Sequence, residues 1–293
     1  MTSDAQPATA LPAHHATLDW REHVGSTQDE LQELVTAGQS QHGTAVATAD
    51  QRAGRGRHGR VWTAPPGSAL ALSVLVDPGH WQPRLADAHL SWVSLVAASA
   101  VAEVLADLGV PVHVKWPNDV MVADGRKICG ILAALTPRSD GDPVLVIGMG
   151  INLDHSAGAP VPTATAVGDW VGPDAIPTPR ALAERVHAAV LTALDDWAHR
   201  LGDRRTAVTG EHPALAGVVR WLSTLGREVD AHLPDGTTLQ GTVVGLGPGG
   251  SLLMEKCDVS HAKMEAREIT AADVVHLRGD VRTATPSAPP KEG

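Results

Sequence analysis

The chain of 293 residues contains no phenylalanine and no tyrosine, so eight tryptophans are its only aromatic residues. Cysteine is nearly absent too: Cys129 and Cys257 are the only two, which excludes a disulfide framework and is typical of the reducing cytoplasm. No CxxC or HxxxH spacing occurs, and the 15 histidines are scattered, so we expect no metal ligands. These shortages predict a cytoplasmic protein that is stabilised by its core alone.

Positive charge is also scarce. The formal net charge is −10, which argues against general affinity for phosphate backbones, and we expect no DNA partner. Residues 1–19 lack the basic and apolar regions of a signal peptide and leave no room for a helix-turn-helix before the first expected helix. The longest apolar stretch, residues 90–108, is interrupted by three serines and two acidic residues. It predicts a buried helix and no membrane partner.

Composition divides the chain into four segments. Residues 1–19 and 279–293 are rich in Ala, Pro and Thr, and are too poor in apolar residues to offset the entropy of ordering, so we expect disordered tails. Residues 20–218 carry mixed patterns that are typical of a larger domain. After Trp221 the hydrophobic period switches to two, which predicts a small β-barrel over residues 219–278.

The periodicity predicts an α+β fold rather than a doubly wound sheet. Thr27 and Glu30 have the spacing of a capping box at the start of a helix, and the Asp124-Gly125 pair is typical of a hairpin turn. Helices are expected over residues 27–35, 85–108 and 180–200, and strands over residues 45–49, 70–76, 112–115, 120–122, 128–135, 144–153, 228–233, 238–246 and 251–254.

Residues 51–62, QRAGRGRHGRVW, form an unusually long connection between two expected strands. Alternating arginine and glycine places guanidinium groups on a backbone that can wrap closely around an anion. An isolated GRGR is also compatible with a solvated loop or a nucleic-acid-binding segment. Because this one occurs once in an acidic protein, lies between strands and ends at Trp62, we interpret it as a functional loop whose arginines and glycine amides can contact phosphate oxygens.

Two further segments carry polar residues next to expected strands. The first is KWPND, residues 115–119, followed by Lys127 and the stretch Gly-Ile-Leu at 130–132. A strand lysine aimed into a cleft suits phosphate oxygens, although a lone strand lysine is more often a solvated surface charge. The second is GMGIN, residues 148–152, whose glycines indicate close packing or a bulge.

Together these segments closely resemble biotin protein ligases. The resemblance includes GST at 25–27, the GRGRxGRxW pattern at 54–62, KWPND, KxxGIL at 127–132 and GxGIN at 148–152, in matching order over about two hundred residues. It implies a catalytic domain related to class II aminoacyl-tRNA synthetases, followed by an SH3-like C-terminal barrel.

The resemblance also implies a two-step reaction. Biotin reacts with ATP in the presence of Mg2+ to form biotinyl-5'-AMP, and a lysine of a biotin carboxyl carrier protein domain then takes the biotinyl group. We expect a monomer or a weak homodimer. Carried over by motif, the expected catalytic residues are Lys127, Arg57, Asp119 and Lys115; the biotin-binding residues are Ser26, Thr27, Gln28, Gln51, Gly54, Arg55, Gly130 and Ile131; and the nucleotide-binding residues are Arg57, Arg60, Trp62, Asn118, Lys127 and Asn152.

Three positions need separate interpretation. Asp119 is the expected carboxylate that orients the acceptor amine and takes its proton, although it could merely cap a turn. Gln28 departs from the family, which usually has Asn there, so biotin contacts could be weakened or rearranged. Cys129 is expected to fill the core, because thiolate chemistry requires an exposed electropositive site.

Two alternative functions remain open at this point. A lipoate or octanoyl protein ligase belongs to the same superfamily, but such enzymes generally lack the arginine-glycine loop that ends in tryptophan. A nucleic-acid-binding regulator is disfavoured by the acidic net charge and by the lack of a helix-turn-helix.

Overall fold

The computed structural model describes residues 17–139, 141–156, 159, 161–255, 266–270 and 272–276. The C-terminal tail expected at 279–293, Cys257 and most of the expected N-terminal tail lie outside these residues. The N-terminal boundary was two residues too late, because Leu18 and Asp19 already belong to the first strand.

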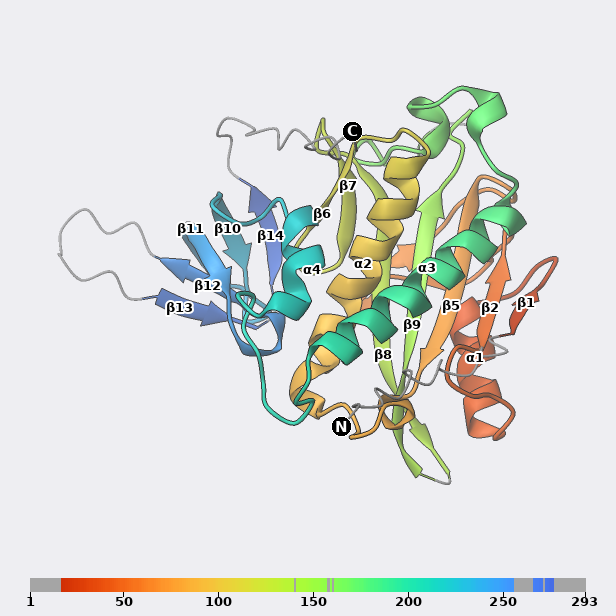
Figure 1. Ribbon diagram of the computed structural model, residues 1–293. Coiled ribbons are helices and arrows are strands. Elements are labelled where there is room, and N and C mark those ends of the chain that lie inside the picture. The colour runs from red at the N-terminus through yellow and green to blue at the C-terminus, as the bar shows by residue number, and fades with distance from the viewer. Residues whose placement is uncertain are drawn as a thin grey trace, which may run out of the picture.

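A seven-stranded sheet forms the larger part of the molecule (Figure 1). Its strand order is β1-β2-β5-β9-β8-β7-β6; β1 and β2 are parallel, and all other neighbours are antiparallel. The mainly antiparallel pairing confirms the α+β prediction. The strands are β1 (Leu18–Trp20), β2 (Ala45–Thr48), β5 (Ala69–Val76), β6 (Val112–Lys115), β7 (Asp119–Val122), β8 (Lys127–Arg138) and β9 (Gly141–Asn152).

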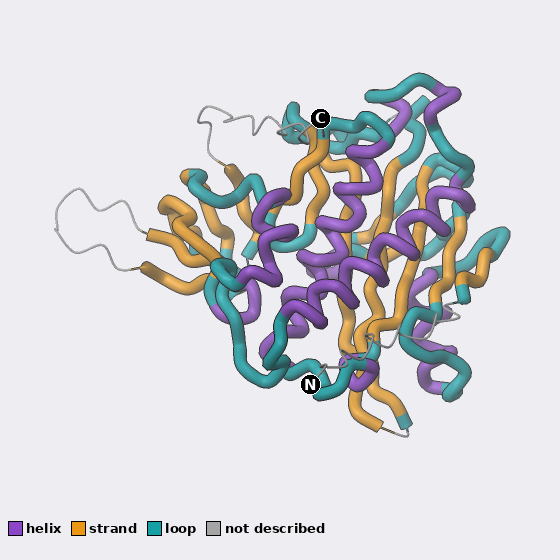
Figure 2. Tube along the Cα trace, in the orientation of Figure 1, coloured by secondary structure: helices purple, strands orange, loops and turns teal. Residues whose placement is uncertain are grey.

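Helices cover both faces of this sheet, as Figure 2 shows for the face packed by α2 and α3. That face holds the main hydrophobic core. On the opposite face, α1 packs Leu31 and Val35 against Val46, Leu75 and Val146. Because β5 lies between the two layers, all of its residues are buried. The α-helices in the described residues are α1 (Thr27–Thr36), α2 (Leu90–Asp107), α3 (Pro179–Arg200) and α4 (Ala216–Trp221).

The capping residue of one helix and the start of another differ from the sequence prediction. The N-cap of α1 is Ser26, whose Oγ accepts a hydrogen bond from the backbone N–H of Asp29 at 3.4 Å. Thr27 is the first helical residue, and its hydroxyl is used elsewhere. The second helix begins at Leu90 instead of residue 85, because a short 3₁₀ turn, Asp87–His89, precedes it.

The long apolar helix is part of the core. By length and hydropathy alone, Asp87–Asp107 is apolar enough to span a membrane. However, 72% of its apolar 18-residue window is buried inside the fold. The burial is typical of a core helix and agrees with the sequence prediction for residues 90–108.

The C-terminal strands form a second, five-stranded antiparallel sheet in the order β13-β12-β11-β10-β14. Among the described residues β13 and β14 are edge strands that do not pair with each other, so the expected closed barrel is not found; the sheet is open, although it is consistent with an SH3-like domain. Its strands are β10 (Glu228–His232), β11 (Thr238–Leu246), β12 (Leu252–Glu255), β13 (Ala266–Ile269) and β14 (Asp273–His276).

The two sheets are joined through buried hydrogen bonds around Trp116. Its backbone N–H donates to Oγ1 of Thr224 at 3.0 Å, and its indole Nε1 donates to the carbonyl of Gly250 at 2.7 Å. Trp116 is buried, and the hydrophobic core continues from α2 into β10, β11 and β12. The C-terminal sheet therefore has a defined position beside β6 and β7.

We predict that Trp116→Phe lowers the free energy of unfolding by about 1–3 kcal/mol, because the carbonyl of Gly250 loses its buried donor. Trp221→Phe is the control, since Trp221 is only half-buried and stacks with Arg220 near the surface. Urea denaturation measures the free energy of unfolding of both variants. Equal losses of this free energy in the two variants would contradict an inter-sheet role for the indole N–H of Trp116.

The expected core role of Cys129 is confirmed, since its side chain is fully buried between β7 and β9. Burial raises the pKa of this thiol to about 12, against a smaller opposing effect of Lys127. The reactive thiolate is therefore scarce at pH 8.

We predict that iodoacetamide leaves Cys129 unmodified in the native protein and alkylates it after denaturation, as peptide mass mapping would show. Modification of the native protein would contradict this burial.

Candidate active site

A pocket opens on the face of the large sheet opposite α2 and α3. Its floor consists of residues that alternate with the core residues of the same strands. In β5, Leu70 and Leu72 face the core while Ala71 and Ser73 face the pocket. The pocket is lined by Ser26, Thr27, Gln28, Gln51, Arg55, Gly56, Arg57, Arg60, Val61, Trp62, Ala71, Ser73, Asn118, Asp119, Lys127, Gly130, Ile131, Leu132, Gly148, Met149, Gly150 and Asp273.

Trp62 lies against two paired glycines of the floor. Gly130 of β8 is in register with Gly150 of β9, which is in turn in register with Ala71 of β5. A Cβ at Gly150 would lie 2.7 Å from Cε2 of Trp62, and one at Gly130 would lie 2.8 Å from Nζ of Lys127. Both positions therefore require glycine while the indole and the lysine occupy these places.

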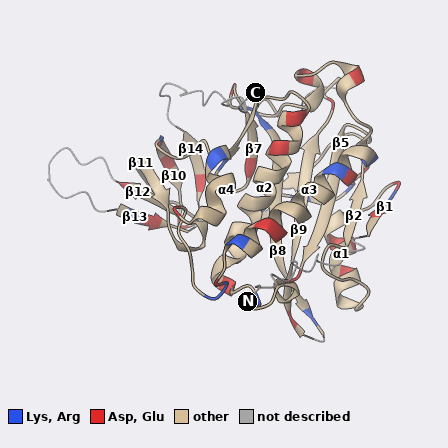
Figure 3. Ribbon diagram, in the orientation of Figure 1, with Lys and Arg blue, Asp and Glu red and all other residues tan. Residues whose placement is uncertain are grey.

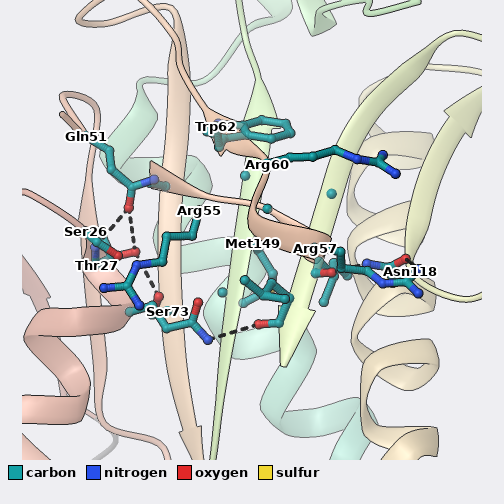
Figure 4. A pocket seen from close by; sticks show the side chains of 18 of the residues that line it. Ser26, Thr27, Gln51, Arg55, Arg57, Arg60, Trp62, Ser73, Asn118 and Met149 are labelled. Atoms are coloured by element: carbon teal, nitrogen blue, oxygen red, sulfur yellow. Dashed lines mark hydrogen bonds between the residues drawn. The ribbon is translucent and has the colours of Figure 1, made fainter. Parts of the chain in front are cut away.

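Hydroxyl and amide groups gather at one end of the pocket (Figure 4). The side-chain Oε1 of Gln51 accepts hydrogen bonds from the backbone N–H of Thr27 at 2.9 Å and from its hydroxyl at 3.2 Å. Oγ1 of Thr27 is also 2.8 Å from Oγ of Ser73. This end can donate to and accept from a neutral polar ligand.

The side chain of Gln28 extends across the sheet rather than toward the hydroxyl groups of Thr27 and Ser73. Its Nε2 donates to the carbonyl of Val146 at 3.2 Å and to that of Leu132 at 3.4 Å. The longer side chain, in place of the family's usual Asn, thus contacts the backbone of β8 and β9 at the pocket wall.

Cationic side chains gather at the other end. Nζ of Lys127 lies 2.5 Å from Oδ1 of Asp119 and 5.9 Å from the ring centre of Trp62. Lys115 stands outside the pocket lining, with Nζ 3.8 Å from Oδ2 of Asp119. One carboxylate therefore positions two ammonium groups.

Two histidines near Lys115 add no charge to this end at neutral pH. Burial lowers the pKa of His113 to about 4, with smaller effects of Arg227 and Lys115 in the same direction. Burial also lowers the pKa of His276 to about 4, again with contributions from Lys115 and Arg227. Both imidazoles are therefore neutral at pH 7.

The arginine-glycine segment forms a short two-stranded hairpin above the pocket, β3 (Gly54–Arg55) and β4 (Val61–Trp62), with a 3₁₀ turn at Arg57–Gly59. Arg55 pairs with Asp29 of α1 at 2.6 Å. Nη1 of Arg57 donates to Oδ1 of Asn118 at 3.2 Å, and Arg60 pairs with Asp273 of β14. The three arginines thus contact three separate parts of the fold: α1, the turn between β6 and β7, and β14.

Most of the residues expected from the motifs line the pocket, and three do not. Gly54 belongs to the hairpin itself, and a Cβ there would be 2.5 Å from Nε2 of Gln51. Lys115 pairs with Asp119 from outside the lining. Asn152 is buried and donates to the carbonyl of Thr165 at 3.0 Å, and its expected contact with the nucleotide stays a prediction.

Sequence reasoning missed three lining residues outside the motifs, Ala71, Ser73 and Asp273. Within the motifs it did not assign Gly56, Val61, Leu132, Gly148, Met149 and Gly150 to the site. The alternation of small and large residues along 69–76 is a signal that could have indicated Ala71 and Ser73. No local signal indicates Asp273, because it meets Arg60 across 213 positions of sequence.

One group of potential metal ligands lies apart from the pocket in the described part of the chain: His42, His80 and Asp195. The two imidazoles are stacked, with ring centres 4.0 Å apart and planes inclined by 10°. Stacked rings cannot both direct in-plane nitrogen lone pairs at one ion, so this arrangement would have to change before it could bind a metal.

Comparison with known proteins places this site in a family. Residues 20–152 match the Biotin/lipoate A/B protein ligase family. A Mycobacterium tuberculosis protein named biotin--[acetyl-CoA-carboxylase] ligase is 33% identical over 269 residues, which cover 89% of this chain and 89% of that protein. An Escherichia coli protein named bifunctional ligase/repressor BirA is 40% identical over 131 residues, 44% of this chain and 38% of that protein.

Solved structures agree with these matches. The structure of the biotin protein ligase from Aquifex aeolicus in complex with biotin and ATP superposes with a TM-score of 0.68 at 25% identity, covering 89% of this chain and 99% of that chain. The similarity to the M. tuberculosis relative extends over nearly the whole of both proteins, and the pocket unites the motif residues. The chain belongs to the biotin protein ligases of the biotin/lipoate A/B protein ligase family.

Proposed function

We propose that this protein is an ATP-dependent ligase that activates biotin as biotinyl-5'-AMP and transfers it to a lysine of a biotin carboxyl carrier protein domain. The observation that carries the proposal is the polarity of the pocket, with neutral hydrogen-bonding groups at one end and lysine and arginine at the other. A ligand with a neutral amide-like ring and a carboxylate tail fits this arrangement. The relatives with which the chain aligns are named for the same activity.

In this proposal the ring of biotin lies over the small-residue floor. Thr27, Gln51 and Ser73 offer the donors and acceptors that a cyclic urea requires. Trp62 covers the glycines of β8 and β9 and limits access of water. The carboxylate tail then points toward Lys127 and Arg57.

The first step joins the carboxylate to the nucleotide. A biotin carboxylate oxygen attacks the α-phosphorus of ATP, the bond to the β-phosphate breaks, and pyrophosphate leaves. Negative charge grows on the phosphoryl oxygens, and cations that are already in place stabilise it without reorganisation. We assign this role to Lys127, held by Asp119, and to Arg57, held by Asn118. Asn118 remains a candidate nucleotide contact, whereas Arg60, which the motif also assigned to the nucleotide, is paired with Asp273.

The second step transfers the biotinyl group to the acceptor. A neutral lysine amine attacks the acyl carbon, AMP leaves with the bonding electrons, and the amine loses a proton. Because a free lysine has a pKa of about 10.4, a nearby carboxylate that orients the amine and accepts its proton accelerates this step. Asp119 is our candidate, since its carboxylate stands at the cationic end of the pocket.

Magnesium is expected to enter with the nucleotide rather than to reside on the protein. The two carboxylates among the described pocket residues are already paired, Asp119 with lysines and Asp273 with arginines. This donor set does not fit an ion held by the protein alone, and Mg2+ commonly binds through substrate phosphates. We therefore assign no protein ligand to it.

The surface is consistent with a protein rather than a polyanion as partner. Acidic and basic positions are interspersed along α3, as Figure 3 shows, and the whole chain is acidic. A carboxyl carrier domain is the acceptor that we propose. The cytoplasmic location and the monomeric or weakly dimeric state stay predictions.

The decisive experiment incubates the protein with biotin, ATP, Mg2+ and a carrier domain, and measures the intact mass of the carrier. One biotinyl group on the carrier supports the proposal, and a carrier with its acceptor lysine changed to arginine is the control. Parallel reactions with lipoate or octanoate test the alternative. Modification by those acids without modification by biotin would overturn the assignment.

We predict that Lys127→Ala slows adenylate formation by about a hundred- to a thousandfold, because a preorganised cation is lost at the developing phosphoryl charge. Biotin binding should persist, since the hydroxyl and amide end is untouched. Pyrophosphate release and calorimetry with biotin measure the two effects. Arg126→Ala, at the exposed neighbouring position, is the control, and near-wild-type release from Lys127→Ala would remove the lysine from the mechanism.

We predict that Gly150→Ala weakens biotin binding by at least about tenfold, because the new methyl group would displace Trp62 from the floor. Gly141→Ala is the matched control in the same strand, since a Cβ there meets no atom within 4 Å. Calorimetric titration with biotin measures both variants. Equal affinities would show that the position of the indole does not matter for the ligand.

A further inference from the structure

The C-terminal sheet contributes a carboxylate to the rim of the pocket. Asp273, the first residue of β14, pairs through Oδ2 with Nη2 of Arg60, and its Oδ1 lies 3.8 Å from Nη1 of Arg57. Nη2 of Arg57 also donates to the carbonyl of Ala272 at 3.5 Å. The arginine hairpin of the larger domain therefore rests on one end of an edge strand of the smaller one.

The position of Asp273 is set by contacts away from the hairpin. Strand β14 pairs with β10, where Val229 to His232 face His276 to Asp273. Nε2 of His276 lies 3.2 Å from Oγ1 of Thr224, which also accepts the backbone N–H of Trp116. A chain of contacts thus connects the KWPND segment to the carboxylate that meets the hairpin.

The two arginines occupy different environments. The side chain of Arg57 is 24% exposed and contacts Asn118 inside the pocket, whereas that of Arg60 is 65% exposed on the outer side. Figure 4 shows the two guanidinium groups separated along the hairpin. Arg57 is therefore suited to the ligand, and Arg60 to holding the hairpin in place.

We infer that Asp273 is a positioning residue: it anchors the arginine hairpin over the pocket through Arg60, so that retention of the adenylate depends on the C-terminal sheet. The inference rests on the proposed function, because the adenylate is its ligand. While the hairpin is anchored, Trp62 and Arg57 stay over the anhydride and water is excluded. Without the anchor the hairpin opens more often and biotinyl-AMP escapes before transfer.

The escape has a chemical signature. Free biotinyl-AMP reacts with any accessible amine: the amine nitrogen bonds to the acyl carbon, AMP leaves, and the proton passes to solvent. Serum albumin added to the reaction therefore reports leakage, and the carrier domain reports productive transfer. The ratio of albumin-bound to carrier-bound biotin measures retention and is independent of the rate of adenylate synthesis.

The test compares Asp273→Asn, Arg60→Gln and the double variant with Glu228→Gln, which removes an exposed carboxylate of β10 in the same sheet. We expect each single variant to raise the albumin-to-carrier ratio by up to about fivefold, the range expected for losing a partly exposed ion pair. The double variant should be no worse than either single one, because both remove the same contact. Asp273→Glu should restore much of the retention.

Amide hydrogen exchange of the ligand-free protein provides a second readout that does not involve biotin. Exchange in residues 54–62 should accelerate by a similar factor in Asp273→Asn and in Arg60→Gln and stay unchanged in Glu228→Gln, with thermal midpoints close to that of the wild type. The anchoring role of Asp273 would be overturned by unchanged amide exchange in residues 54–62. It would also be overturned by an unchanged albumin-to-carrier ratio in a variant that makes adenylate. Failure of the wild type to label the carrier would instead overturn the proposed function, and the exchange comparison would still decide the anchor.

Discussion

A row of small residues across three neighbouring strands is the constraint on which the rest of the site depends. Ala71, Gly150 and Gly130 are in register on β5, β9 and β8, and all three face away from the main core. A side chain at either of the two glycines would meet Trp62 or Lys127. The strands can carry such a row because their opposite faces supply the large apolar residues that hold the sheet.

Charge in the pocket is arranged in pairs rather than as an unopposed patch. Lys127 and Lys115 share Asp119, Arg55 pairs with Asp29, and Arg57 and Arg60 lie beside Asp273. Each carboxylate fixes the direction of a long cationic side chain that would otherwise lose more conformational entropy on binding an anion. An acidic protein can in this way present a strongly cationic site at one end of one pocket.

The partners of these pairs come from separate parts of the chain, and this explains the role of the second sheet. Trp116 links β6 to the C-terminal strands by two buried hydrogen bonds, and β14 then brings a carboxylate to the hairpin. The small domain is therefore not merely attached to the catalytic one. Its docking decides how the arginine hairpin is supported.

The sequence alone determined the order and type of most elements. Apolar, β-branched runs predicted β5 and β9, the period of two predicted β11, and helical spacing predicted α3 to within a residue, because these patterns report which side chains are buried. Thirteen of the residues that the motifs assigned to the site line the pocket. Element starts were less well determined: Ser26 and not Thr27 caps α1, since both hydroxyls suit a cap and only packing leaves Thr27 to Gln51 and Ser73.

Only the tertiary structure decided which residues meet. It brought Asn152 to the carbonyl of Thr165, paired Lys115 with Asp119, left the C-terminal sheet open among the described residues and brought Asp273 to Arg60. Each outcome depends on contacts between segments that are far apart in the chain, and short-range patterns carry no record of them. Sequence patterns determined which segments form strands and helices, whereas the packing of the two sheets determined which charges face each other.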